Sequence, residues 1–328
     1  MVAFFVDFHW ISDILVTMSE DIDKIIQNCV SLKPKELIIS DLKWKYLVRA
    51  VLRSKNIMII GQSGCAKTMA ARCVATALKR PFDKYNIGST QDARATLIGN
   101  TTYKKETGTV FHKSGFIKSI TTPFTVVCLD EFSRGTHDCH NILMPTLDPI
   151  QRCIRLDEDE SSMVINVAEG VSFIATANIG NEYTATKVLD KASSRRFPIK
   201  LEMSPLNGVE LSRLFGILFG KKATSDQNKL LKILTKISDD LIAQCKLEDS
   251  SISSIISPAN MVEMAELVLD GFTLEEIAEA AIYPEYPDDG GADSERTYVK
   301  SIIQKYFSKD VKSPIHDPLK KDEEELPF

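Results

Sequence analysis

The sequence predicts an α/β fold in which a parallel sheet flanked by helices carries β-hairpin inserts and is followed by a small all-helical domain. Three observations predict this class. Short apolar runs alternate with helix-type segments as far as Met203. A loop of phosphate-binding type follows the first of these runs. From Leu206 onward, apolar residues recur only at helical spacing.

Three apolar runs, over residues 57–60, 124–129 and 171–176, predict buried parallel strands, and residues 67–79 have the composition of a helix. Each run is followed at once by polar residues. In an open α/β sheet, ligands collect at this edge. Turn residues between β-prone segments also predict two hairpins, over 101–112 and 152–167.

The chain changes character at Ser204-Pro205, where we place a domain boundary. Apolar residues at helical spacing then predict four helices, and a segment with two prolines and two glycines predicts a loop over 283–293. The end of the chain has the composition of a flexible tail. The four predicted helices cover residues 211–218, 230–242, 261–269 and 298–307.

The composition restricts the classes of protein to consider. The 328 residues are 44% hydrophobic and 26% charged, which is enough to bury the core of one large or two modest domains. With 40 Lys and Arg against 45 Asp and Glu, the net charge of −5 offers no global attraction to nucleic acid or an anionic membrane, although a local basic patch is compatible with it. Seven cysteines without a C-x-x-C pair indicate reduced thiols in an intracellular, cytoplasmic protein.

The apolar opening segment is interrupted by Asp7, His9 and Asp13 and has no Lys or Arg ahead of it. This pattern argues against both a membrane-spanning helix and a signal peptide. Met18 followed by Ser-Glu-Asp resembles a natural start of translation. Residues 1–17 are therefore either an upstream extension of the reading frame or an interaction strand.

The loop after the first apolar run has the length and the Lys-Thr ending of a P-loop, and it lies between a predicted strand and a predicted helix. Backbone N–H groups of such a loop turn inward around a phosphate, and the following helix directs its positive end at the same anion. Lys67 would reach the β- and γ-phosphates, and Thr68 would supply a hydroxyl to Mg²⁺. The predicted binding residues are Gly61, Gln62, Ser63, Gly64, Cys65, Ala66, Lys67 and Thr68.

One residue of this loop departs from the motif, because Ala66 stands where a glycine is usual. Alanine adds only a methyl group, so a backbone with negative φ is tolerable at Ala66. Cys65 is either a somewhat activated thiol among phosphate-binding amides or, in the favoured interpretation, a small space-filling residue. An ordinary glycine turn is the alternative interpretation of the whole loop.

Further polar residues follow the other predicted strands. Asp130 would hold the metal, in part through its water shell, and Glu131 would polarise an attacking water. Asn178 would orient that water or touch the γ-phosphate. Arg195 and Arg196 suit charge stabilisation in phosphoryl transfer, although a solvated surface pair is the ordinary alternative.

In order and spacing, these segments resemble the MoxR-like branch of the AAA+ ATPases, to which the cobaltochelatase small subunit, the dynein-related AAA modules and several phage-encoded ATPases are related. The resemblance implies an N-terminal extension over 1–36, a P-loop AAA+ core over 37–203, a helical lid over 204–307 and an acidic tail over 308–328. The segments that carry it are 57–68, 97–99, 108–115, 129–134, 175–178 and 189–197.

The resemblance also implies the role of each site residue. Arg196 matches the arginine finger that acts on the nucleotide of a neighbouring subunit, which implies a ring, commonly a hexamer. Arg195 stands where the family more often has an acid, so either arginine can be the one that reaches across. The remaining matches are Lys67 and Thr68 as Walker A ligands of ATP and Mg²⁺, Asp130 as the Walker B metal ligand, Glu131 as the water-activating residue and Asn178 as sensor 1.

Two segments need separate comment: one departs from the pattern of the family, and the other matches it but allows two interpretations. Residues 257–260 read Ser-Pro-Ala-Asn where relatives often read Ser-Pro-Arg, so the sensor 2 arginine is missing or displaced. The hairpin over 101–112 falls where the family has a pore-lining insert, and its aromatic and lysine residues either grip a polymer or are merely solvated.

The chain also carries three possible metal ligands close together, His137, Cys139 and His140. They are too few for a zinc site and fit packing or surface roles.

We therefore expect an ATP-hydrolysing ring ATPase that remodels or loads a protein partner in a bacterial or phage-infected cell. Relatives often act with a partner bearing a von Willebrand factor A domain. The alternatives are a nucleotide-gated scaffold with slow hydrolysis and a DNA- or RNA-directed motor. The acidic C-terminus, ending in Leu326-Pro327-Phe328, is similar to the tip by which bacterial single-stranded-DNA-binding proteins dock into partner pockets.

Overall fold

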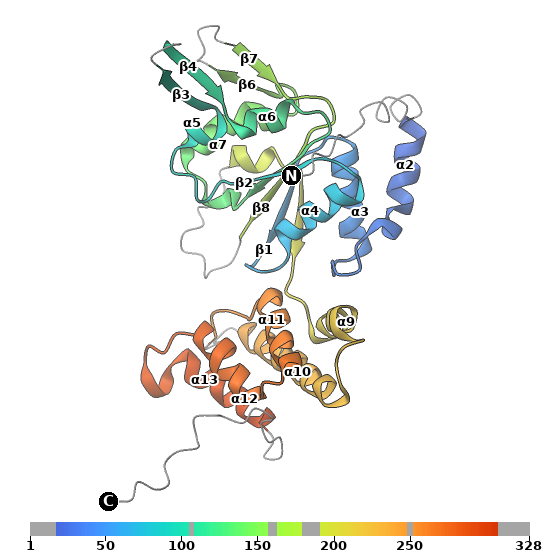
Figure 1. The fold of residues 1–328 in the computed structure, drawn as a ribbon, viewed down its shortest axis with the longest axis vertical. Coiled ribbons are helices and arrows are strands. Elements are labelled where there is room, and N and C mark those ends of the chain that lie inside the picture. The colour runs from blue at the N-terminus through green and yellow to red at the C-terminus, as the bar shows by residue number, and fades with distance from the viewer. Residues whose placement is uncertain (1–17, 105–107, 157–162, 179–190, 248–251, 308–328) are drawn as a thin grey trace, which may run out of the picture. The chain divides into compact units, whose positions relative to one another are not determined.

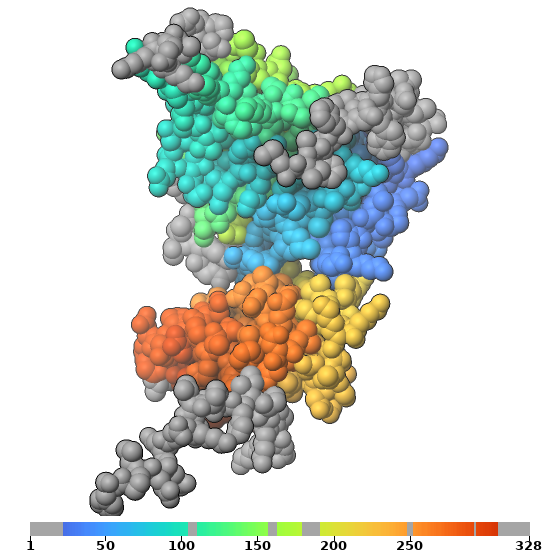
Figure 2. All heavy atoms as spheres, viewed as in Figure 1, coloured from blue at the N-terminus to red at the C-terminus, as the bar shows by residue number. Residues whose placement is uncertain are grey.

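The computed structural model describes residues 18–104, 108–156, 163–178, 191–247 and 252–307. The chain divides into two compact units. One unit comprises residues 1–61 and 67–203, and the other comprises residues 204–328 together with the short loop 62–66. In the space-filling view the first unit runs mainly from blue to green and the second from yellow to red (Figure 2).

The first unit is built on a five-stranded parallel sheet with the strand order β2-β5-β8-β1-β9. Every residue of β5 and β8 is buried, which explains why the sequences of these strands are mostly apolar. The three predicted strands are confirmed as β1, β5 and β8, although β5 begins at Val126 because Phe124 has a φ of 62°. The strands are β1 (Ile57–Gly61), β2 (Phe82–Asn86), β5 (Val126–Asp130), β8 (Ser172–Ala177) and β9 (Ile199–Met203).

Helices cover both faces of this sheet (Figure 1). One layer contains α3 and α4, whose buried side chains include Trp44 and Val74. The opposite layer contains α5 to α7, from which Leu97, Ile117 and Leu143 join a core with the apolar residues of β5 and β8. The helices are α2 (Met18–Asn28), α3 (Asp41–Leu52), α4 (Lys67–Ala77), α5 (Ala93–Leu97), α6 (Gly115–Thr121), α7 (His137–Leu147) and α8 (Lys191–Arg195), with 3₁₀ turns at Cys29–Leu32 and Phe132–Arg134.

Two antiparallel hairpins project beyond α5 and α6 in Figure 1 and confirm the two predicted hairpins. The first pairs β3 (Gly99–Lys104) with β4 (Gly108–Lys113), and the second pairs β6 (Cys153–Leu156) with β7 (Met163–Asn166). The residues that connect the strands, 105–107 and 157–162, lie outside the described residues, as do 1–17 and the predicted tail.

The second unit is helical, with a core that includes Phe215, Ile237 and Met264. Three of its helices begin with a capping box, in which Asn207, Thr224 and Thr273 each exchange hydrogen bonds with the residue three positions later. The four predicted helices are confirmed, whereas α12 was not predicted, and the segment predicted as a loop contains two 3₁₀ turns. The helices are α9 (Gly208–Phe219), α10 (Ser225–Cys245), α11 (Pro258–Asp270), α12 (Leu274–Ile277) and α13 (Glu295–Ile303), with a π turn at Ala278–Ile282 and 3₁₀ turns at Tyr283–Glu285, Gly291–Asp293 and Gln304–Tyr306.

Two further findings bear on the protein class. Within the described ranges, none of the helices has the length and apolar character needed to cross a lipid bilayer. None of the seven cysteines takes part in a disulfide bond.

Candidate functional site

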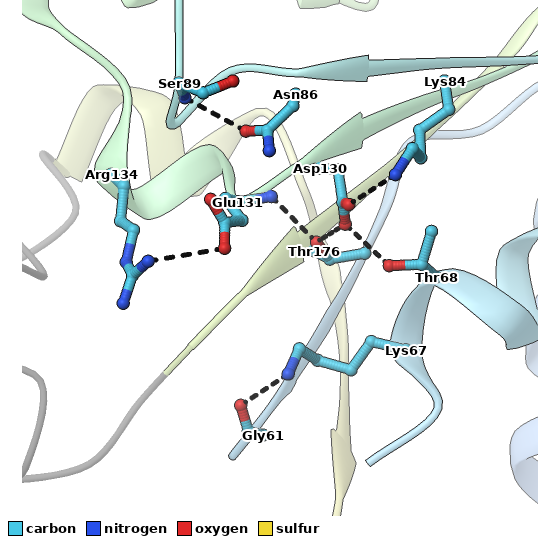
Figure 3. Close-up of polar contacts among 10 residues, drawn as sticks. All are labelled: Gly61, Lys67, Thr68, Lys84, Asn86, Ser89, Asp130, Glu131, Arg134 and Thr176. Carbon is cyan, nitrogen blue, oxygen red and sulfur yellow. Dashed lines mark hydrogen bonds and ion pairs between the residues drawn. The ribbon is translucent and has the colours of Figure 1, made fainter. Parts of the chain in front are cut away.

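The predicted site residues lie where the carboxyl ends of the central strands meet. Leu129 of β5 is in register with Ala175 of β8, and Ala177 of β8 is in register with Ile60 of β1. Because all three strands run in the same direction, Asp130, Asn178 and Gly61 reach the same edge of the sheet. Figure 3 shows the side chains from α4, β2 and β8 that converge there.

Gly61 ends β1 where the backbone of the neighbouring strand β9 comes close. A Cβ at Gly61 would lie 2.3 Å from the carbonyl oxygen of Met203, so no other residue fits without moving one of these strands. The chain then continues through the loop 62–66 into α4, with Gly64 at a φ of 74°.

The backbone at Ala66 is not in the negative-φ region that an alanine tolerates, since its φ is +56°. The loop reaches the first residue of α4 through a left-handed backbone, which is the conformation that the usual glycine supplies without strain. In an alanine the same conformation costs about 1–2 kcal/mol. This loop is therefore strained at the position where the sequence departs from the motif.

Lys67 and Thr68 begin α4 and point toward the sheet edge (Figure 3). Lys67 is only 8% exposed, and its Nζ donates a hydrogen bond to the carbonyl oxygen of Gly61 at 2.9 Å. The Thr68 hydroxyl donates to Oδ1 of Asp130 at 2.7 Å. The first turn of α4 therefore supplies an ammonium group and a hydroxyl group, and the hydroxyl pairs with the carboxylate at the end of β5.

Asp130 is the residue on which the contacts of this site converge. Its Oδ1 accepts hydrogen bonds from the hydroxyls of Thr68 at 2.7 Å and Thr176 at 2.6 Å, and its Oδ2 lies 3.4 Å from Nζ of Lys84. Burial by itself would raise the pKa of Asp130. The hydrogen bonds from Thr176 and Thr68 outweigh this effect and, with the charge of Lys84, hold the pKa below its usual value. The carboxylate is therefore ionised at neutral pH.

Glu131 follows with a left-handed backbone, at φ 53° and ψ 38°. Its N–H donates to the Thr176 hydroxyl at 3.0 Å, and its Oε1 lies 3.4 Å from Nη1 of Arg134. A Cβ on Gly88 would lie 2.8 Å from both Cβ and Oε2 of Glu131, so the loop after β2 forms a wall against this side chain. The Glu131 side chain remains about one-third exposed.

The other predicted residues are placed as follows. Asn178 lies directly after β8 and is 7% exposed. Arg195 is exposed at the end of α8. Arg196 pairs with Asp148 at 3.1 Å, and its carbonyl accepts a hydrogen bond from Asn56. The described contacts thus bring Lys67, Thr68, Asp130 and Glu131 to one place and engage Arg196 elsewhere in its own chain.

Sequence reasoning missed three residues that contact this site, namely Thr176, Lys84 and Gly88. Thr176 was visible as a hydroxyl two positions before Asn178 on a mostly apolar strand, but threonine is also an ordinary strand former. Lys84 and Gly88 lie on and after β2, which carried no strand signal because two of its residues are half-buried and three are exposed. Only the strand order places them beside Asp130 and Glu131.

Of the two histidines of α7, His137 is exposed and His140 packs against Phe132. His140 lies with Nε2 2.8 Å from the carbonyl oxygen of Phe132 and its ring stacks obliquely on the Phe132 ring, while Cys139 is buried in the core. Among the residues that the structure describes, no three His, Cys, Asp or Glu side chains gather in a metal-binding arrangement.

Comparison with known proteins agrees with this geometry. Residues 56–197 match the model of the AAA domain of the dynein-related subfamily. Over 144 residues the chain is 33% identical to "Putative chaperone BssE" of Thauera aromatica, a match that covers 43% of this chain and 48% of BssE. Over 216 residues it is 26% identical to "Uncharacterized protein SSP1341" of Staphylococcus saprophyticus, covering 63% of this chain and 78% of that protein.

Among solved structures, the chain resembles the closed-state cryo-EM reconstruction of Hsp104 with ATPγS and FITC casein. The TM-score is 0.50 at 16% sequence identity, and the match covers 82% of this chain and 50% of the Hsp104 chain, so it shows the fold alone. The chain spans about half the length of both BssE (48%) and the Hsp104 chain (50%). The parallel sheet, the loop before α4 and these matches together show that the unit that holds the site has the α/β P-loop fold of AAA+ proteins.

Proposed function

We propose that this protein is an AAA+ ATPase that binds ATP with Mg²⁺, hydrolyses it and uses the cycle to remodel or load a protein partner. The observation that carries this proposal is the convergence on Asp130 of two hydroxyls, from Thr68 at 2.7 Å and Thr176 at 2.6 Å, beside the buried Lys67. Such a cluster of oxygen donors next to a P-loop lysine suits a nucleotide with a hard cation.

The residues present fit Mg²⁺. The hydroxyl of Thr68 and the ionised carboxylate of Asp130 are oxygen donors of the kind that Mg²⁺ prefers, and they lie within hydrogen-bonding distance of each other. When bound, Mg²⁺ would neutralise charge on the β- and γ-phosphates. We assign Thr68 and Asp130 as the residues that hold it.

The remaining roles follow from position and charge. The backbone N–H groups of residues 61–66 and the ammonium of Lys67 would bind the phosphates. Glu131 would accept a proton from the attacking water, and Asn178, at the neighbouring strand end, would orient that water. A buried lysine placed against phosphate oxygens stabilises negative charge that increases during phosphoryl transfer.

The wider biological role rests on the resemblance and on one relative. We propose a core over 37–203, a lid over 204–307, an N-terminal extension, a C-terminal tail, and a MoxR-like ring in the cytoplasm in which an arginine acts on the neighbouring subunit's nucleotide. The chaperone name of BssE favours a protein client, and a protein with a von Willebrand factor A domain is one candidate partner.

Phosphate release by the purified protein tests the proposal. We expect Mg²⁺-dependent ATP hydrolysis, loss of nucleotide binding in Lys67→Ala, and a 10²–10⁴-fold slower turnover with retained binding in Glu131→Gln, which is about the contribution of a general base. Lys118→Ala and Glu169→Gln change exposed residues of the same types and should behave as wild type. Equal turnover in all five proteins would overturn the assignment.

A second candidate function is a nucleotide-gated scaffold that hydrolyses ATP slowly. It is favoured by α11, which contains neither Arg nor Lys where relatives often carry an arginine, and in which Asn260 donates to Glu285 at 2.9 Å. Tight ATP-dependent assembly with negligible basal phosphate release would support the scaffold. Rapid basal hydrolysis would contradict it.

A further inference from the structure

The buried hydroxyl of Thr176 contacts both acidic residues of the proposed site. It donates to Oδ1 of Asp130 at 2.6 Å and accepts the N–H of Glu131 at 3.0 Å (Figure 3). Thr176 is 1% exposed, so water does not substitute for either contact. The hydroxyl group of Thr176 therefore acts once as a donor and once as an acceptor.

We propose that Thr176 is a positioning residue that sets the geometry of both acids, holding the Asp130 carboxylate toward Thr68 and fixing the backbone turn that presents Glu131. This inference rests on the proposed function and deepens it. Thr176 itself would touch neither nucleotide nor metal.

The first half of the argument concerns Asp130. The torsion of a carboxylate about its last bond is soft, so hydrogen bonds decide which way its two oxygens point. The ammonium of Lys84 lies 3.4 Å from Oδ2, while the two hydroxyls hold Oδ1. Without the Thr176 hydroxyl, only Thr68 would oppose rotation of the carboxylate toward Lys84. The metal-holding pair of Thr68 and Asp130 would then lose its fixed orientation.

The second half concerns Glu131. The last pair in the ladder of β5 with β8 joins Leu129 to Ala175, and beyond it the chain leaves the sheet through the left-handed backbone of Glu131. The Thr176 side chain supplies the acceptor for the Glu131 N–H after the strand backbones have parted. A buried N–H without an acceptor is costly, so the hydroxyl stabilises this particular turn.

The strand itself offers a matched control. Ser172 is at the other end of β8, is equally buried, and has a hydroxyl without a hydrogen-bond partner among the described residues. Thr176→Val keeps the β-branched shape and removes the hydroxyl, Thr176→Ser keeps the hydroxyl and removes the methyl group, and Ser172→Ala removes an unused hydroxyl from the same strand.

Two readouts separate positioning from packing. The first is hydrogen exchange at the Glu131 amide in the nucleotide-free protein, which we expect to be about tenfold faster or more in Thr176→Val and unchanged in the other two variants. The second is Mn²⁺ affinity with a non-hydrolysable ATP analogue. We expect Thr176→Val to weaken it about 10–100-fold, as is typical when a residue that orients a metal ligand is lost. Nucleotide affinity in EDTA should stay unchanged.

Several outcomes would overturn the inference. Thr176→Val with wild-type Mn²⁺ affinity would do so, as would a Thr176→Ser variant as impaired as Thr176→Val, which would show that only the methyl group matters. If Thr176→Val does not fold, Thr176→Ala carries the same expectations. A wild-type protein that binds neither the analogue nor Mn²⁺ would refute the proposed function and this inference together, whereas wild-type binding with unaffected variants refutes the inference alone.

Discussion

At the residue scale, Gly88 is placed so that any side chain would disturb Glu131. A Cβ there would lie 2.8 Å from Cβ and Oε2 of Glu131 and 3.0 Å from Cβ of Arg134. We expect Gly88→Ala to slow hydrolysis about tenfold or more, since a loss of only about 1.4 kcal/mol in transition-state stabilisation has this effect. Nucleotide affinity should change little, because Gly88 contacts neither Lys67 nor Thr68 in the described contacts. Steady-state kinetics and equilibrium binding of a nucleotide analogue measure the two effects.

Gly216→Ala is the control for this substitution. Gly216 is an exposed residue of α9, and a Cβ there would meet nothing within 4 Å. The change should leave hydrolysis unaffected and stabilise the helix by about 0.5–1 kcal/mol. Wild-type turnover in Gly88→Ala would show that Glu131 does not depend on the loop after β2.

The strain at Ala66 gives a separate prediction. Its φ of 56° is costly for alanine and ordinary for glycine. We expect Ala66→Gly to raise the free energy of unfolding by about 1 kcal/mol, after allowing for the greater freedom of glycine in the unfolded chain. Urea or thermal unfolding of the two proteins side by side provides the measurement. A destabilised variant would show that another conformation of residue 66 is populated.

Still at the residue scale, the sequence was sufficient to predict those site residues that belong to a recognisable motif. Lys67, Thr68, Asp130 and Glu131 follow apolar runs at recognisable spacing, and the structure brings them together. Thr176 could not be identified, because a threonine in a buried strand is explained by strand propensity until its hydroxyl is seen between two acids. The backbone conformation at Ala66 could not be predicted for a related reason: residue size limits the allowed φ, but the path of the loop selects it.

At the scale of elements, the strands that were predicted are buried, and the strand that was missed is half-exposed. β5 and β8 are buried at every position, so their sequences are mostly apolar, and both strands were predicted. The edge strand β2 has the sequence Phe-Asp-Lys-Tyr-Asn, with three exposed residues, and gave no such signal. Yet β2 supplies Lys84 and leads to Gly88. The part of the site that sequence reasoning missed therefore comes mainly from the element that it missed.

The long helices of the second unit were predicted because a longer helix repeats its amphipathic pattern more times. α10, with 21 residues, repeats its apolar positions often enough to be recognised. α12 has four residues and does not complete a second turn, so its only sequence signal is the capping box that joins Thr273 and Glu276. Short elements of this kind are defined by their caps and neighbours more than by periodicity.

At the scale of the whole molecule, the contacts of the two arginines lead to a proposal for which of them acts on a neighbouring subunit. Arg196 is held in its own chain: its guanidinium pairs with Asp148 at 3.1 Å, and its carbonyl accepts from Asn56. The backbone N–H groups of Ile150 and Gln151, and the charge of Arg196, lower the pKa of Asp148, so that carboxylate is ionised and retains its partner near neutral pH. Arg195 is exposed at the end of α8. In a ring of the proposed kind, Arg195 is therefore the arginine available to a neighbouring subunit.

We expect Arg195→Ala to bind nucleotide normally and to lose hydrolysis, whereas Arg196→Ala should keep hydrolysis and lose at most a little stability with its ion pair to Asp148. Mixing provides the decisive measurement. Arg195→Ala subunits have an intact nucleotide site, and Lys67→Ala subunits have an intact arginine, so mixing the two inactive proteins should restore phosphate release if the arginine acts in trans. Mixtures of Lys67→Ala with Glu131→Gln should stay inactive, because neither subunit offers a complete site.

Recovery that requires Arg196 rather than Arg195 would reverse the two assignments. Hydrolysis by Arg195→Ala alone at the wild-type rate would remove Arg195 from the mechanism.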